Sequence, residues 1–145
     1  PFSIGASVML ITSEKYAKKN GLKIRAYIEG RAVAGVNWTM FGSGPIPATA
    51  KALKNTGLSM DDIDVVEINE AFAAQALYCI RKADWDESKV NLNGGAIALG
   101  HPLGISGTRI ITTLLNVLEQ QDKSTGLATM CVGTGQGITT IIKRG

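Results

Sequence analysis

The stretch IDVVEINEAFAAQALYCIRKA, residues 63–83, joins a short apolar run to a longer segment with a different hydrophobic period. The run IDVVEI, residues 63–68, is rich in β-branched side chains and is typical of a buried strand. After this run, Phe72, Ala76 and Ile80 recur at the spacing of one helix face. The stretch therefore predicts a strand followed directly by a helix, which is the repeating unit of α/β folds.

The same alternation of short β-like runs and longer helical runs extends along the rest of the chain, with Gly, Asn, Ser or Pro at the junctions. We expect strands at 6–12, 22–36, 63–68 and 89–93, a carboxyl-terminal hairpin over 126–144, and helices at 13–20, 45–55, 69–83 and 106–121. Helices that alternate with strands imply a sheet covered by helices on both faces. No internal repeat or linker interrupts the pattern, so a single α/β domain over residues 1–145 is predicted.

Composition narrows the class of protein. With 45% hydrophobic and 19% charged residues, the chain is predicted to be globular and soluble. The net charge of +3 comes from scattered lysines and arginines without interleaved aromatic residues, so no nucleic-acid partner is expected. The apolar runs are too short to span a bilayer and no secretion signal opens the chain, which favours a cytoplasmic protein without a membrane partner. Because the first residue is Pro1 rather than Met, we expect further sequence upstream.

Three polar residues fall where predicted strands end. Asn69 directly follows the strand at 63–68, His101 lies in the loop after 89–93, and Cys131 lies near the end of the first arm of the hairpin. Ligands of α/β sheets bind beyond the carboxyl ends of the strands, so we expect these groups to converge. An amide, an imidazole and a thiol beside glycine-rich backbone suit acyl chemistry, in which a thiol transfers protons and N–H donors hold an oxyanion.

Each of these residues also has a purely structural interpretation. Asn69 is suited to cap the helix that follows it, with Glu70 complementing the helix dipole. A lone histidine such as His101 is most often a surface residue, and Cys131 has the apolar neighbours of an inert core thiol. Cys79 lies mid-helix and is predicted to be structural, and the two cysteines lack the paired spacing of a zinc site or a disulfide framework. The glycines of 93–107 do not have the spacing of a Rossmann or P-loop phosphate cradle.

Four motifs, in this order, resemble the carboxyl-terminal half of the thiolases: FGSGPIPA (41–48), NEAFAAQ (69–75), NGGAIALGHPLGISGTRI (93–110) and CVGTGQG (131–137). The resemblance covers essentially the whole chain. It implies a thiolase-like fold, in which this half contributes a mixed five-stranded sheet between helices. Thiolases include acetyl-CoA acetyltransferases and 3-ketoacyl-CoA thiolases of fatty acid metabolism, which transfer acyl groups between coenzyme A thioesters by making or breaking a carbon–carbon bond. The resemblance implies no cofactor or metal beyond the acyl-CoA and acetyl-CoA substrates.

The resemblance also implies a role for each matching residue. His101 is expected to activate the nucleophilic cysteine and to bind the thioester oxygen, while Asn69 holds a water that completes this first oxyanion site. Cys131 is expected to be the acid/base for the α-proton. A free thiol has a pKa of about 8.5, so Cys131 can serve near neutral pH if its surroundings, His101 and local amides among them, favour the thiolate modestly. The backbone N–H of Gly133 is expected to help form the second oxyanion site. The acyl and pantetheine pocket is expected to be lined by Phe41, Ala71 and Phe72.

Two departures from the family pattern affect activity. The nucleophilic cysteine of thiolases belongs to their amino-terminal half, which is absent from this chain. We therefore expect that the isolated chain does not turn over substrate and that it needs the amino-terminal half as a partner. The intact protein is expected to form a homo-oligomer, a dimer or a tetramer. The start PFSIGA has Ile4 at a position that is usually acidic, which predicts either an unusual loop or slightly divergent substrate contacts. The alternatives are a non-catalytic thiolase-like binding or assembly module and a ketoacyl-synthase-like condensing domain.

Overall fold

The computed structural model describes residues 3–145, so Pro1 and Phe2 at the start of the PFSIGA segment lie outside the described residues. The strands are β1 (Ala26–Gly35), β2 (Val65–Ile68), β3 (Thr125–Val132) and β4 (Gln136–Arg144). The α-helices are α1 (Glu14–Lys19), α2 (Pro45–Thr56), α3 (Ala73–Lys82), α4 (Ala96–Leu99) and α5 (Ser106–Gln120). Short 3-10 helices are η1 (Trp38–Ser43), η2 (Met60–Asp62) and η3 (Glu87–Lys89).

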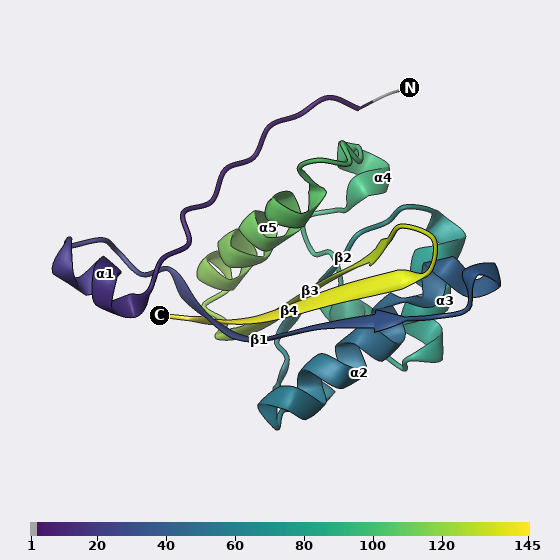
Figure 1. Ribbon diagram of the computed structural model, residues 1–145, viewed down its shortest axis with the longest axis horizontal. Coiled ribbons are helices and arrows are strands. Elements are labelled where there is room, and N and C mark those ends of the chain that lie inside the picture. The colour runs from purple at the N-terminus through teal and green to yellow at the C-terminus, as the bar shows by residue number, and fades with distance from the viewer. Residues whose placement is uncertain (1–2) are drawn as a thin grey trace.

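The strands form one mixed sheet in the order β1-β4-β3-β2. β4 pairs antiparallel with both β1 and β3, whereas β2 pairs parallel with β3. Helix α5 covers one face of the sheet, and α2 and α3 cover the other (Figure 1). A mixed α/β sheet with helices on both faces is therefore confirmed, but the sheet of the described residues has four strands, and the expectation of five is wrong.

The core is divided between the two faces because neighbouring strand residues point in opposite directions. Val65 packs beneath α5, whereas Val66 packs beneath α2 and α3. The cluster beneath α5 comprises Val65, Ile110, Leu114, Leu115, Val117, Leu118, Ala128 and Ile142. The cluster on the opposite face comprises Ala32, Ala52, Ile63, Val66, Ile68, Cys79, Ile80, Trp85, Leu127 and Ile141. Burial on both faces explains why IDVVEI is a continuous apolar run rather than an alternating one.

Most of the predicted elements are confirmed. Helix α1 begins after Ser13, whose Oγ accepts a hydrogen bond from the backbone N–H of Tyr16, and α2 begins at Pro45 and ends before Gly57 at a φ of 72°. The long strand expected at 22–36 is β1, which has an irregular register between Ile28 and Gly30. Strands β3 and β4 form the expected hairpin.

The strand expected at 6–12 is wrong. This segment, together with the residues just before it, forms an extended arm that runs along the α5 side of the sheet toward α4 (Figure 1). No backbone N–H or C=O of residues 4–12 has a hydrogen-bond partner within residues 3–145. The apolar side chains of the arm are largely exposed, with Val8 at 92%. The sequence has the pattern of a strand, but the described residues supply no neighbouring strand to pair with it.

The strand expected at 89–93 is also wrong, since the segment makes one isolated parallel bridge, between Val66 and Val90. Asn91 then turns the chain with a φ of 48°, a left-handed conformation that asparagine tolerates. Its side chain replaces the missing ladder, because Oδ1 accepts from the backbone N–H of Ile68 at 2.8 Å and Nδ2 donates to the carbonyl of Ile68 at 3.0 Å.

Candidate functional site

Asn69 lies where β2 ends, and its backbone N–H donates to the carbonyl of Thr129 on β3 at 2.9 Å. The residue is completely buried. Helix α3 starts four residues later, with Phe72 as its N-cap residue, so the interpretation of Asn69 as a helix cap is wrong. Its Nδ2 instead lies 3.3 Å from Nε2 of His101. The structure therefore brings together an amide and an imidazole from separate motifs.

The His101 ring is held on both sides. Its Nδ1 lies 2.6 Å from Oγ of Ser106, and that hydroxyl donates its hydrogen to the carbonyl of Pro102 at 3.0 Å. Because the hydroxyl has one hydrogen, Nδ1 carries a proton and donates to Ser106, and Nε2 is left as the acceptor for Asn69. Burial lowers the pKa of His101, and the nearby positive charge of Arg109 lowers it further. His101 is thus a neutral, oriented imidazole, and its interpretation as a free surface residue is wrong.

One acceptor at this site has no partner. Oδ1 of Asn69 is buried and makes no hydrogen bond within the described part of the chain. A buried amide oxygen without a donor costs free energy, so such an atom is suited to a water or ligand donor. This atom lies on the same side chain that contacts Nε2 of His101.

Cys131 lies near the end of β3, two residues beyond the Thr129 carbonyl that holds Asn69. Since side chains alternate along a strand, Cys131 and Thr129 point to the same face. Cys131 is partly exposed and makes no disulfide. Burial raises the pKa of the Cys131 thiol, so the condition that its surroundings favour the thiolate is not met in this chain. The group is a protonated thiol near neutral pH.

Gly133 lies in the tight turn between β3 and β4 and has a φ of 57°, a conformation that favours glycine. A Cβ at this position would also lie 2.6 Å from Oε1 of Gln136. The turn therefore requires glycine directly after the strand that carries Cys131.

Of the residues expected to line an acyl pocket, Phe41 and Phe72 are exposed and Ala71 is partly buried. Phe41 lies on η1 and is 45% exposed, and Phe72 precedes α3 and is 63% exposed, with Ala71 beside it. Helix η1 docks on α3 because the carbonyl of Gly42 accepts from Nε2 of Gln75 at 3.2 Å and from Sγ of Cys79 at 3.3 Å. Cys79 is completely buried, and burial raises its pKa, so its prediction as a structural residue is confirmed.

Sequence reasoning missed the residues that support His101 and Asn69. Ser106 fixes the imidazole, and its signal is its place at the start of a predicted helix, five residues after the histidine. Glu70 does not complement the dipole of α3. Its Oε1 accepts from Nδ2 of Asn91 at 2.9 Å, and its Oε2 accepts from the backbone N–H of Ile97 at 3.0 Å.

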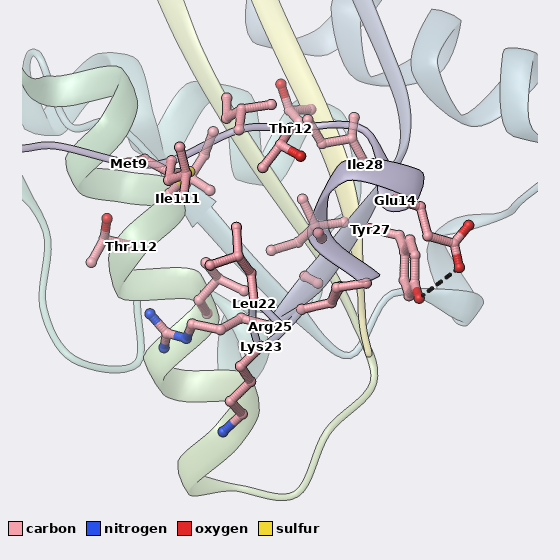
Figure 2. A pocket seen from close by; sticks show the side chains of 18 of the residues that line it. Met9, Thr12, Glu14, Leu22, Lys23, Arg25, Tyr27, Ile28, Ile111 and Thr112 are labelled. Carbon is pink, nitrogen blue, oxygen red and sulfur yellow. Dashed lines mark hydrogen bonds between the residues drawn. The ribbon is translucent and has the colours of Figure 1, made fainter. Parts of the chain in front are cut away.

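A cavity of about 540 Å³ lies elsewhere, between the arm, α1, β1 and α5 (Figure 2). Its wall is mostly apolar and includes Met9, Leu22, Ile28 and Ile111. None of the residues expected at the site lines it, so the candidate site is defined by hydrogen-bond geometry and not by this hollow. Within residues 3–145, no cluster of three or more His, Cys, Asp or Glu side chains is placed to hold a metal ion. No helix among these residues is long and apolar enough to cross a membrane.

Comparison with known proteins agrees with this architecture. The profile of the family described as "Thiolase, C-terminal domain" matches residues 22–144. The 3-ketoacyl-CoA thiolases of Vibrio cholerae serotype O1 (strain O395) and Pseudoalteromonas atlantica are both 61% identical to the chain, over 98% of this chain and 38% of their own length. The chain therefore spans well under half the length of these curated relatives.

Solved structures give the same result. The crystal structure of human mitochondrial 3-ketoacyl-CoA thiolase in complex with CoA is 47% identical and superimposes with a TM-score of 0.90, over 92% of this chain and 34% of that one. The crystal structure of the Bacillus anthracis acetyl-CoA acetyltransferase is 44% identical, with a TM-score of 0.89 over 91% and 34%. This chain belongs to the thiolase family and matches its carboxyl-terminal domain.

Proposed function

We propose that this chain is the carboxyl-terminal catalytic domain of a thiolase that transfers acyl groups between coenzyme A thioesters, by carbon–carbon cleavage of a 3-ketoacyl-CoA or by the reverse Claisen condensation. The observation that carries the proposal is the neutral His101 ring, held by Ser106 through Nδ1 and placed 3.3 Å from the amide of Asn69. Relatives that are 61% identical to this chain are named 3-ketoacyl-CoA thiolases.

His101 is the base and the first oxyanion donor in this proposal. With Nδ1 protonated, Nε2 carries the lone pair, which accepts from Nδ2 of Asn69 in this chain and takes the proton of a nucleophilic thiol when that group is present. Once protonated, Nε2 donates to the thioester oxygen as negative charge develops on it. Asn69 contributes a water to the same oxygen, which is supported by its buried amide side chain with an unpartnered Oδ1.

Cys131 exchanges the α-proton. In cleavage, the nucleophilic thiolate adds to the keto carbon, the carbon–carbon bond breaks, and the departing enolate of acetyl-CoA takes a proton from Cys131. In condensation, the Cys131 thiolate removes that proton. The raised pKa of Cys131 keeps the thiol protonated near neutral pH, which supports the cleavage direction. The backbone N–H of Gly133, in the adjacent turn, is assigned to the second oxyanion site.

The substrate side of the site is apolar. We assign Phe41, Ala71 and Phe72 to contacts with the acyl chain and the pantetheine arm of acyl-CoA. Their exposure supports this assignment, because two large aromatic side chains without cover are suited to an apolar ligand or partner surface.

The nucleophilic cysteine comes from an amino-terminal thiolase half in this proposal, so the chain alone is inactive. That the intact protein is a homo-oligomer stays an expectation from the family resemblance. Of the two cysteines in the chain, Cys79 is buried in the core and Cys131 has the acid/base role. The exposed arm and the adjacent hollow support a large partner surface on the α5 side (Figure 2). A location in the cytoplasm stays a prediction from the sequence.

A chimera tests this function. In the chimera, this chain replaces the matching carboxyl-terminal segment of the Vibrio cholerae relative. Thiolysis of acetoacetyl-CoA is then followed with the purified protein. We expect activity in the chimera, none in the chain alone, and a loss of roughly 100- to 1000-fold in kcat in the chimera for His101→Ala or Cys131→Ser. Folded chimera that shows no thiolysis, or thiolysis by the isolated chain, contradicts the proposal.

A further inference from the structure

Within residues 3–145, the Glu70 side chain makes no hydrogen bond to the helix that follows it and reaches a different segment. One oxygen of its carboxylate accepts from Nδ2 of Asn91 at 2.9 Å, and the other accepts from the backbone N–H of Ile97 in α4 at 3.0 Å. Asn91 in turn holds the backbone of Ile68 through both its amide atoms. The carboxylate therefore ties the end of β2 to both ends of the segment 91–97.

Gly95 makes room for this carboxylate. A Cβ at Gly95 would lie 2.3 Å from the carboxyl carbon of Glu70 and 2.4 and 2.6 Å from its oxygens. The φ of Gly95 is −117°, which any residue can adopt, so glycine is not required by backbone conformation. The close approach of Glu70 is what requires glycine here, and this is the physical reason for one of the glycines in NGGAIALG.

The segment held by Glu70 leads directly to His101. Helix α4 ends at Leu99 and is followed by Gly100 at a φ of 90° and then by His101. Glu70 itself directly follows Asn69 in the sequence. The same carboxylate thus holds the two backbone segments that deliver the amide and the imidazole to their 3.3 Å contact.

We propose that Glu70 is a positioning residue for His101, which fastens the first turn of α4 to the end of β2 and thereby sets the contact between Asn69 and His101. Its effect on catalysis rests on the function proposed above. The effect of Glu70 on the His101 ring does not rest on that function, because the ring geometry is a property of this chain alone.

The tautomer of His101 tests the proposal directly. The chain has a single histidine, so the ¹⁵N signals of one imidazole are assigned without ambiguity. At about pH 8, where an imidazole is neutral, we expect the wild-type ring to carry its proton on Nδ1. Glu70→Gln replaces one carboxylate oxygen by an NH2 group, which then faces either Nδ2 of Asn91 or the backbone N–H of Ile97, both of them donors. The hold of residue 70 on the segment 91–97 therefore loosens, and we expect the His101 tautomer with its proton on Nε2 to become populated. Glu87→Gln on η3 removes an exposed carboxylate of the same type and is expected to leave the tautomer unchanged.

A second pair of variants separates positioning from a general loss of stability. Gly95→Ala is expected to expel the carboxylate and to shift the tautomer as Glu70→Gln does. In a Glu70→Ala background the same Gly95→Ala change meets no carboxylate, so it is expected to add little to either the tautomer shift or the loss of stability. The proposal is overturned if Nδ1 stays protonated in both Glu70→Gln and Gly95→Ala, or if the effects of Glu70→Ala and Gly95→Ala add.

Kinetics in the chimera link this geometry to catalysis. We expect Glu70→Gln to lower kcat by up to roughly 100-fold with little change in the KM for acetoacetyl-CoA, because a small misplacement of a catalytic group acts mainly on the reacting atoms. A chimera that is inactive with wild-type Glu70 contradicts the proposed function and leaves the tautomer result standing as the test of Glu70. An active chimera whose kcat is unchanged by Glu70→Gln overturns the catalytic part of the inference.

Discussion

At the scale of the residue, Glu67 is the most unusual group in the core. It lies on β2 between Val66 and Ile68, is 1% exposed, and neither of its carboxylate oxygens has a hydrogen-bond partner among the described residues. The guanidinium of Arg109 is buried nearby and is equally without a hydrogen bond in this part of the chain. Burial raises the pKa of Glu67 to about 8, although Arg109 opposes the shift. The carboxyl group is therefore mostly neutral at pH 7.

This pKa predicts that the protein loses stability as the pH rises. Between the ordinary value of 4.5 and about 8, the folded state binds the Glu67 proton and the unfolded state does not. The contribution to stability is complete below pH 4.5 and is lost as the pH rises to about 8, with a magnitude on the order of 5 kcal/mol. Urea unfolding at pH 5, 6, 7 and 8 measures it. Glu67→Gln is expected to reduce the fall in unfolding free energy with rising pH. Glu29→Gln is the control, since Glu29 is an exposed residue of β1, and it is expected to leave that fall unchanged. An equal pH dependence in all three proteins rules out a titrating Glu67.

At the scale of the element, two motifs meet where α2 approaches β4. A Cβ at Gly137 on β4 would lie 2.0 Å from the carbonyl oxygen of Gly44, the residue that precedes α2. A Cβ at Gly44 would in turn lie 2.4 Å from the carbonyl oxygen of Gln136. The backbone of FGSGPIPA is therefore in direct contact with the backbone of CVGTGQG. This contact fixes η1, and with it Phe41, against the turn that carries Gly133.

We predict that Gly137→Ala separates these elements. The new methyl group meets rigid backbone rather than a flexible side chain, so the unfolding free energy is expected to fall by about 3 kcal/mol or more. Gly104→Ala is the matched control, because a Cβ there meets nothing within 4 Å and the change is expected to stay within about 0.5 kcal/mol. Chemical denaturation of both variants compares them, and equal stabilities show that the backbone contact is absent in solution.

The elements also show how far the sequence determines the fold and the site. Local signals were sufficient for α2, α5, β2 and the β3–β4 hairpin, where capping, period and burial agree. They failed at 6–12 because the described residues supply no strand to pair with it, and at 89–93 because the chain turns away from β2 at Asn91 after a single bridge. The strand-end rule predicts that Asn69, His101 and Cys131 converge, and the structure shows the contact of Asn69 with His101. It missed Ser106 and Glu70, since their hydrogen bonds join loops whose approach depends on the tertiary fold.

At the scale of the whole molecule, the α5 side is incompletely covered. The arm crosses this side without backbone hydrogen bonds in the described region and encloses a hollow of about 540 Å³ against β1 and α5 (Figure 2). Apolar residues with large exposed fractions gather on the arm: Ile4, Val8, Leu10 and Ile11. A β-patterned segment with free amides and exposed apolar side chains is suited to pairing with another strand. The chain spans 38% of the length of these relatives, and we predict that a strand from the rest of such a thiolase pairs with the arm.

Hydrogen exchange tests whether the arm becomes a strand when that part is present. In the chain alone, amides of residues 7–12 are expected to exchange at nearly the rate of an unfolded peptide, because no hydrogen bond within residues 3–145 protects them. In the chimera, the same amides are expected to slow by roughly 100-fold or more, since pairing makes their exchange depend on opening of the sheet. Peptides from β3 and β4 serve as the internal control, because their ladder is complete in the chain itself. Protection of 7–12 in the isolated chain would show that the arm already has a partner there, and rapid exchange in an active chimera would show that the thiolase half leaves the arm unpaired.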